Sequence, residues 1–405
     1  MRRLIPYFPA LVMDFCLGTI MTNTAFFSTS LSLSASFIGT LGAISTLLFS
    51  IFAIPFGRLS DRVGRPILLG AGCLLVMAVS LALPQCRNSF HLLTIYPWLG
   101  VSQALFWPTY EAWLAERQGE ETLIQRLCLF NLFWCSGITL GPLLSSYVQK
   151  TPSPNFPFYL VGGLSILNWW MISYRPKFSQ QNLIETDQQI TNSVPQRPIY
   201  INRLYINRSF LYMSRIANFG SWFTLRILQL ITPKLATEQM NIQPSQYAKL
   251  IAALGIMQLL TYIWYGSKKS IVFHYRLLPL WGPQIALVIG MFIMGKSYQF
   301  SIWFIVFGLL GVSVATTYFS SMYYGLVDGP QIKDKDGKGE QTGWHEAILG
   351  SGALLGPLCG GWMADQTQDP HSPYLLCSGL IFGLLILQLW IWLTMRDSDK
   401  TNQST

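Results

Sequence analysis

Twelve runs of mainly apolar residues, each close to 20 residues long, follow one another along this 405-residue chain. About 20 apolar residues make a helix long enough to cross a bilayer, and a helix pairs its own backbone groups where water is absent. Only 11% of the residues are charged, against about 25% in a typical soluble domain. The pattern predicts an all-α membrane protein with twelve transmembrane helices. We place the spans at residues 4–27, 36–56, 66–84, 91–114, 126–148, 157–173, 209–232, 246–265, 277–295, 300–325, 343–364 and 373–394.

The basic residues are distributed unevenly between the two sides that these spans define. With the N-terminus inside, the inner segments hold 20 of the 27 lysines and arginines, the outer segments hold 5, and Arg215 and Arg226 lie within the seventh span. This is the asymmetry of the positive-inside rule. The net charge of +9 therefore reflects membrane orientation, and no nucleic-acid partner is expected. We predict a multi-pass protein of the plasma membrane, or of the inner membrane in a Gram-negative cell, with both termini cytoplasmic.

The longest polar stretch between spans, residues 174–208, divides the twelve spans into two sets of six. It is rich in Gln, Asn, Pro and Arg, which is typical of a flexible cytoplasmic linker. The predicted organisation is an N-terminal bundle over 1–173, a C-terminal bundle over 209–396 and a cytoplasmic tail over 397–405.

The two halves also contain related short segments. Residues 100–104 (GVSQA) recur as 311–315 (GVSVA), at an offset of 211, and the pattern G-x-x-x-G-P at 137–142 recurs at 352–357, at an offset of 215. Such echoes in corresponding spans predict two pseudo-symmetric six-helix bundles. Small residues four apart let a neighbouring helix approach closely, so a packing function is predicted for Gly137, Gly141, Pro142, Gly352, Gly356 and Pro357.

A charged segment joins the second and third spans. Its key residues, Gly57, Asp61, Arg62, Gly64 and Arg65, follow the pattern G-x-L-x-D-R-x-G-R. The glycines permit a tight reversal, and the aspartate suits a helix N-terminus, where the dipole favours an anion. This segment resembles the loop between the second and third spans of major facilitator superfamily transporters.

The resemblance implies a central cavity lined by the first, fourth, seventh and tenth spans, and alternating access by rocking of the two bundles. It also implies that the 57–65 segment gates transport, with Asp61 docking near residues 343–346 and favouring the outward-open state. The corresponding segment of the second half, 266–276, has no aspartate. The fifth-span G-x-x-x-G-P resembles a motif of antiporters. However, residues 145–146 are serines where that motif has glycines, and Tyr96 stands where antiporters often have arginine.

Ionisable residues within spans are costly, about 2.5–3.5 kcal/mol for a central charge, and therefore point to a functional site. The seventh span carries polar residues spaced three and four apart, which places them on one helix face. The fourth span has a second such face, and the first span contains one acid. The candidates for substrate binding are Gln103, Trp107, Arg215, Asn218, Trp222 and Arg226, and the candidates for ion coupling are Asp14 and Glu111.

We expect the arginines to bind an anionic or polar group of the cargo, and Asp14 or Glu111 to be the protonation switch. Desolvation disfavours the charged form of a carboxyl group and a nearby arginine favours it, so cargo at the arginine would shift the acid's protonation. Simpler alternatives remain. In these alternatives, Glu111 is a solvated residue at the end of its span or pairs with Arg117. Asp14 forms a salt bridge within its own bundle, and Arg215 extends its side chain to the membrane surface.

Other chemistry finds little support in the sequence. There is no G-x-x-x-x-G-K-[ST] loop for ATP, the seven cysteines show no C-x-x-C spacing, and the four histidines are scattered. We predict no catalytic residues, no cofactor and no metal site. The charged loop over 328–341 has a composition loosely like that of a calcium loop but lacks the ligand spacing, so it is interpreted as a solvated cytoplasmic loop.

The sequence therefore predicts a secondary active transporter of a small polar or amphipathic solute, working by proton-coupled efflux. An uptake symporter for a sugar or an organic anion is the alternative, and a non-transporting sensor or an intramembrane enzyme on the same fold is more remote. The expected partners are a small-molecule substrate, a proton or another coupling ion, and the lipid bilayer, with the protein acting as a monomer.

Overall fold

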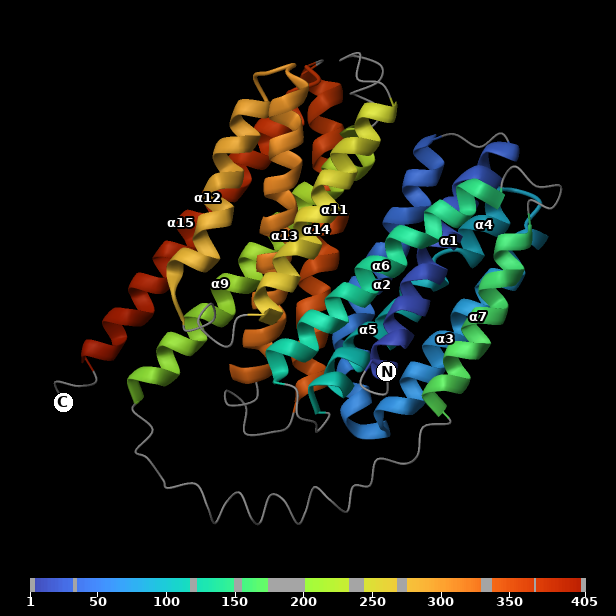
Figure 1. Ribbon diagram of the computed structural model, residues 1–405, viewed down its shortest axis with the longest axis horizontal. Coiled ribbons are helices and arrows are strands. Elements are labelled where there is room, and N and C mark those ends of the chain that lie inside the picture. The colour runs from blue at the N-terminus through green and yellow to red at the C-terminus, as the bar shows by residue number, and fades with distance from the viewer. Residues whose placement is uncertain are drawn as a thin grey trace, which may run out of the picture.

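The computed structural model describes residues 4–31, 35–116, 122–148, 155–173, 201–232, 244–267, 275–328, 337–367 and 369–401. These residues form an all-helical protein in which two groups of helices lie side by side (Figure 1). Helices α1 to α7 make one bundle and α9 to α15 make the other. In the described part of the chain, eight helical segments are long and apolar enough to cross a membrane by length and composition.

The first bundle contains each predicted span, with one interruption. The fourth span is broken at Tyr96 and Pro97, because proline has no amide hydrogen and its ring disfavours helix in the preceding residue. The Asn88 side chain caps the short helix before the break by accepting from the His91 amide at 2.9 Å. The elements are η1 (Ile5–Tyr7), α1 (Phe8–Ser30), α2 (Ala35–Val63), α3 (Arg65–Ala82), η2 (Leu83–Gln85), α4 (Ser89–Ile95), α5 (Trp98–Glu116), α6 (Leu123–Val148) and α7 (Phe156–Ser173).

The second bundle also follows the predicted spans, but several helices run beyond the apolar stretch. The eleventh-span helix begins at Lys338 rather than 343, and the seventh-span helix begins at Ile201, inside the segment predicted to be linker. Residues 174–200 of that segment lie outside the described ranges. The elements are α9 (Ile201–Arg226), a π-helical turn η3 (Ile227–Ile231), α11 (Pro244–Ser267), α12 (Leu277–Met294), α13 (Phe300–Asp328), α14 (Lys338–Thr367) and α15 (Ser372–Thr401).

Helices α2 and α3 are joined by one non-helical residue, Gly64. Helix α2 continues to Val63, so most of the predicted loop over 57–65 is helical. The φ angle of Gly64 is 105°, a conformation that costs a residue with a side chain considerably. This glycine therefore makes the sharp reversal that the spacing of the motif predicted.

The two bundles touch along α2 and α14, where glycines remove the side chains between the helices. A Cβ atom added to Gly57 would collide with the backbone of Gly339, and one added to Gly343 would collide with the backbone of Ala53. Helix α5 also contacts α14, and the Thr342 hydroxyl donates to the Pro108 carbonyl oxygen at 2.6 Å. The bundles are thus held together at the end of the molecule that carries Asp61, which we call the Asp61 end.

Candidate functional site: a central pocket and a closed end

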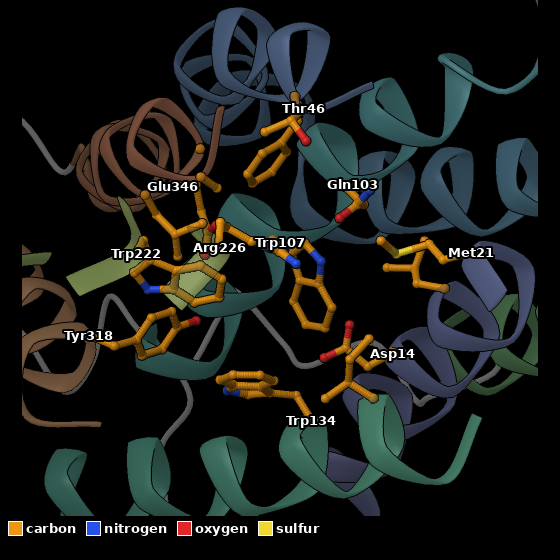
Figure 2. Close-up of a pocket in the computed structure, with 16 residues that line it drawn as sticks. Asp14, Met21, Thr46, Gln103, Trp107, Trp134, Trp222, Arg226, Tyr318 and Glu346 are labelled. Atoms are coloured by element: carbon orange, nitrogen blue, oxygen red, sulfur yellow. The ribbon is translucent and has the colours of Figure 1, made fainter. Parts of the chain in front are cut away.

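A pocket enclosing about 810 Å³, part of it open to the outside, lies between the two bundles. Helices α1, α2, α5 and α6 contribute from the first bundle, and α9, α13 and α14 from the second (Figure 2). The lining residues are Asp14, Leu17, Met21, Thr46, Phe49, Gln103, Trp107, Trp134, Ile138, Trp222, Arg226, Tyr318, Glu346, Leu349, Gly350 and Ala353.

Five aromatic side chains line the pocket, and one of them is Phe49 of α2. Trp107 and Trp134 come from the first bundle, and Trp222 and Tyr318 come from the second. The Tyr318 ring lies 5.6 Å from the Trp134 ring and 6.2 Å from the Trp222 ring, measured between centroids. Both pairs are tilted and bridge helices that are distant in sequence. Centroid separations of about 4.5–7 Å are those of interacting aromatic pairs.

The pocket also contains charges from both bundles. The Arg226 guanidinium lies 5.5 Å from the centre of the Trp222 ring, a cation–π contact, and its Nη1 donates to Gln229 Oε1 at 3.2 Å. Asp14 approaches from α1, on a different side of the aromatic group from Arg226 (Figure 2). A π-helical turn starts directly after Arg226, and such turns are frequent at functional sites.

The Asp61 end is closed by an acid on the N-terminus of α14. Asp61 Oδ1 accepts from the Gly339 amide at 3.0 Å, and Oδ2 accepts from the Glu340 amide at 3.2 Å. These amides belong to the first turn of α14. The N–H groups of a first turn have no carbonyl partners within the helix, and the positive end of the helix dipole lies there. A carboxylate is therefore well suited to this position.

Arginines of α2 and α3 extend this contact. Arg65 pairs with Asp61 at 2.6 Å and with Glu116 of α5 at 2.5 Å, and it also donates to Ser60. Arg58 pairs with Glu340 of α14 at 2.9 Å. Arg65 thus positions Asp61 within the first bundle, whereas Asp61 and Arg58 reach across to the second.

The comparison with known families decides what kind of protein this is. The sequence profile described as the Major Facilitator Superfamily matches residues 7–331, which is most of the chain. The chain belongs to the Major Facilitator Superfamily. It is therefore a secondary transporter rather than an enzyme, and the two bundles with a pocket between them are the architecture expected of this class.

Individual members of the superfamily resemble this transporter at low identity. An MFS-type transporter of Mycobacterium tuberculosis is 23% identical over 342 residues, covering 80% of this chain and 76% of the relative. The quinolone resistance protein NorA of Staphylococcus aureus is 22% identical over 394 residues, covering 95% and 94%. The crystal structure of the human organic anion transporter MFSD10 (TETRAN) matches with a TM-score of 0.69 at 14% identity, covering 96% of this chain and 99% of that one.

The residues predicted to bind cargo fall into two groups in this transporter. Gln103, Trp107, Trp222 and Arg226 line the pocket. Arg215 lies instead towards the Asp61 end, where its Nη2 donates to Gln341 Oε1 at 2.7 Å.

The remaining predicted polar residues divide in the same way. Asp14, predicted for ion coupling, lines the pocket. Asn218 is buried outside the pocket lining, and its amide has no hydrogen-bond partner within the described ranges. Glu111 is fully buried between the bundles, where its Oε1 accepts from the Tyr318 hydroxyl at 3.0 Å. The pocket residues Trp134, Tyr318 and Glu346 were not predicted.

The G-x-x-x-G-P segments lie against equivalent neighbours in the two bundles of the transporter. A Cβ atom on Gly137 or Gly141 of α6 would collide with the backbone of α1, and one on Gly352 or Gly356 of α14 would collide with the backbone of α9. Pro357 lies inside α14, whereas the side chain of Pro142 is outside the described set.

A second polar cluster lies between the pocket and the Asp61 end. It consists of Glu111 on α5 and His345 and Glu346 on α14, whose ligand atoms all lie within 4.8 Å of one another. The exposed fractions of these residues are 0%, 0% and 4%. The sequence indicated no such cluster, because 234 residues separate Glu111 from His345.

Proposed function

We propose that this transporter exports an amphipathic solute with an aromatic ring, in exchange for protons. The walls of the pocket support the cargo class. Trp107, Trp134, Trp222 and Tyr318 offer ring faces, and aromatic pairs contribute about 0.5–1.5 kcal/mol beyond the area they bury. Arg226 and Asp14 then offer a cation and an acid to the polar groups of the cargo. The similarity to a quinolone resistance protein supports export as the direction.

One observation carries the coupling proposal: Asp14 and Arg226 line the same pocket from opposite bundles. Cargo held between them contacts both halves at once. If the cargo presents a donor or a cationic group to the Asp14 carboxylate, a proton and the cargo compete for the same oxygens. Competition of this kind is what exchange requires, because the two then occupy the site in turn.

The closed Asp61 end represents one of the two conformations that alternating access requires. In this conformation Asp61 and Arg58 hold the bundles together at one end, and Arg65 positions Asp61. We infer that rocking of the bundles breaks these contacts, closes the opposite end and exposes the pocket on the other side. The superfamily's alternating-access cycle needs two such states.

The test uses purified transporter in proteoliposomes with a quinolone as cargo. Wild-type binding should weaken as the pH falls, because protons displace the cargo, and an imposed pH gradient should drive movement of the quinolone. Asp14→Asn should retain binding within about tenfold (~1.4 kcal/mol) and lose the response to the gradient. A variant that still follows the pH gradient would remove Asp14 from coupling, whereas loss of binding in Arg226→Ala tests the cargo site separately.

A second candidate function is supported by Arg226. A guanidinium in a pocket is well suited to a carboxylate or another oxyanion, so uptake of an organic anion together with a proton is the alternative. The two functions predict opposite changes of cargo affinity with pH. Proton–anion co-binding makes affinity for the anion rise as the pH falls, whereas exchange makes affinity for the cargo fall. Binding of benzoate and of a quinolone, each measured from pH 8 to pH 6, distinguishes them.

A further inference from the structure

The cluster of Glu111, His345 and Glu346 has a geometry that the transport proposal does not use. Glu111 lies on α5 of the first bundle, and His345 and Glu346 lie on α14 of the second. Glu346 lines the pocket. Glu116, which pairs with Arg65 at the Asp61 end, is five residues further along α5, about 7.5 Å at helical rise. The cluster therefore spans the two bundles, just inside the closed end.

The atoms that face the centre of this cluster are electron-pair donors. The Tyr318 hydroxyl donates to Glu111 Oε1 at 3.0 Å, and the imidazole Nδ1 of His345 hydrogen-bonds the Ser321 hydroxyl at 2.9 Å. These contacts leave His345 Nε2 buried and without a hydrogen-bond partner in the described part of the chain, and they leave the Glu111 and Glu346 carboxyl groups within hydrogen-bonding distance of each other. Nε2 lies 4.0 Å from Glu346 Oε1, which is too long for a hydrogen bond.

The charges around the cluster leave it without a bonded cation among the described residues. Arg215 is engaged by Gln341, and Arg226 is engaged by Trp222 and Gln229. Two buried carboxyl groups this close share either a proton or a cation, because ionised carboxylates removed from water are expensive unless they are paired or coordinate a metal. One divalent cation between Glu111 and Glu346 would replace that proton and let both groups ionise.

We propose that Glu111, His345 and Glu346 bind one divalent transition-metal cation of the Zn²⁺ class. Imidazole nitrogen together with carboxylate oxygen is a ligand set for zinc and its neighbours, with metal–ligand distances of about 2.0–2.2 Å. Ligand atoms within 4.8 Å of one another reach such a centre by small side-chain movements. Ser321 and Tyr318 are placed to orient the ligands from behind, as outer-shell partners do in metal sites.

A cation at this position would join α5 to α14. Because those helices belong to different bundles, the bound metal would stabilise the conformation in which the Asp61 end is closed. It would enter from the pocket, which Glu346 lines. This inference is independent of the cargo and of proton coupling, because metal binding is measured on the purified protein without transport.

The test uses full-length transporter, freed of any histidine tag, washed with chelator and held in nanodiscs. ZnCl₂ should bind with a stoichiometry of one per chain by calorimetry and should raise the unfolding temperature, because a ligand bound only by the folded state stabilises it. CoCl₂ should give the visible d–d bands of imidazole-ligated Co²⁺. MgCl₂ should give neither effect.

Ligand variants sharpen the test. Glu346→Gln, Glu111→Gln and His345→Gln should each weaken Zn²⁺ binding by about tenfold or more. His91→Ala removes an exposed imidazole of α4 and should leave binding unchanged. If a ligand variant fails to fold, the Co²⁺ spectrum of the wild type still distinguishes a low-coordinate protein site from hydrated Co²⁺. Absence of saturable Zn²⁺ binding, equal affinity for Mg²⁺, or unchanged binding in Glu346→Gln would overturn the proposal.

Discussion

The two bundles are alike where helices touch and unlike where they face the pocket. Gly100 of α5 lies against the backbone of α2, and Gly311 of α13 lies against the backbone of α11 in the same manner. The pocket shows no such agreement. The first bundle contributes Asp14 and the second contributes Arg226 and Glu346.

The repeated positions are therefore those that pack helices together, and the positions that differ are those that line the pocket. Close contact of two helices requires a small residue at one depth, so the packing positions repeat in both halves. The side chains that face the pocket are not constrained by close contact between helix backbones, and they need not repeat. The Asp61 end is similarly one-sided, since the counterpart of Asp61 is missing from the 266–276 segment of the second half.

The largest effect is expected from the packing glycines. Gly100→Ala and Gly311→Ala each place a methyl group against the backbone of a neighbouring helix, and overpacking of this kind costs about 1–3 kcal/mol. Thermal unfolding of the purified protein should show a similar loss of stability for both. Gly163→Ala is the matched control, because a Cβ atom there meets nothing within 4 Å and alanine favours the helix by about 0.5–1 kcal/mol.

A large difference in stability between the two glycine variants would contradict the equivalence of packing in the two bundles. A stable Gly311→Ala beside an unfolded Gly100→Ala would show that the second bundle tolerates separation of α11 and α13. The packing glycines would then be repeated in the sequence, but they would contribute unequally to the stability of the two bundles.

The next effect concerns the pocket charge. Arg226→Ala should weaken cargo binding by about tenfold or more, equivalent to ~1.4 kcal/mol or more, as measured by quenching of tryptophan fluorescence. Arg226→Lys keeps the charge but loses the planar fork and should fall in between. Arg215→Ala removes the other arginine of α9, which contacts Gln341 outside the pocket lining, and should leave cargo affinity close to that of the wild type. Equal losses in both alanine variants would contradict the assignment.

The sequence predicted the helices well because their cause is local. Apolar length and the scarcity of charge determine each span, so every predicted span is helical, although the fourth is broken at Tyr96 and Pro97. The ends were less predictable, since α14 begins at Lys338, before its apolar stretch. Placing its start at 343 put Glu346 at the membrane surface, and its place in the pocket lining was therefore missed. An acid two turns inside a helix would have been noticed.

The pocket was only partly predictable, because it is assembled from seven helices. The spacing of residues along α9 placed Arg215 and Arg226 on one stripe, but 11 residues correspond to about 16.5 Å along a helix. One end of that stripe lines the pocket and the other contacts Gln341. The periodicity of a sequence predicts which residues share a helix face. It does not predict how far along that face the pocket extends. The functions of these residues stay predictions until cargo binding is measured.

The smallest effect is expected at Asp61. Asp61→Asn keeps the shape of the contact with the Gly339 and Glu340 amides but removes the charge, and charge–dipole interactions at a helix terminus amount to about 0.3–2 kcal/mol. The variant should express and fold normally, transport more slowly, and close the Asp61 end less often, as measured by the distance between spin labels on α2 and α14. Asp369→Asn is the matched control. Asp369 accepts from the His371 amide at 2.9 Å, just before α15 begins at Ser372, so it also bonds a backbone amide, but within one segment rather than between bundles. If both variants slowed transport equally, the effect would come from loss of any aspartate–amide contact, and Asp61 would lose its proposed function as a gate.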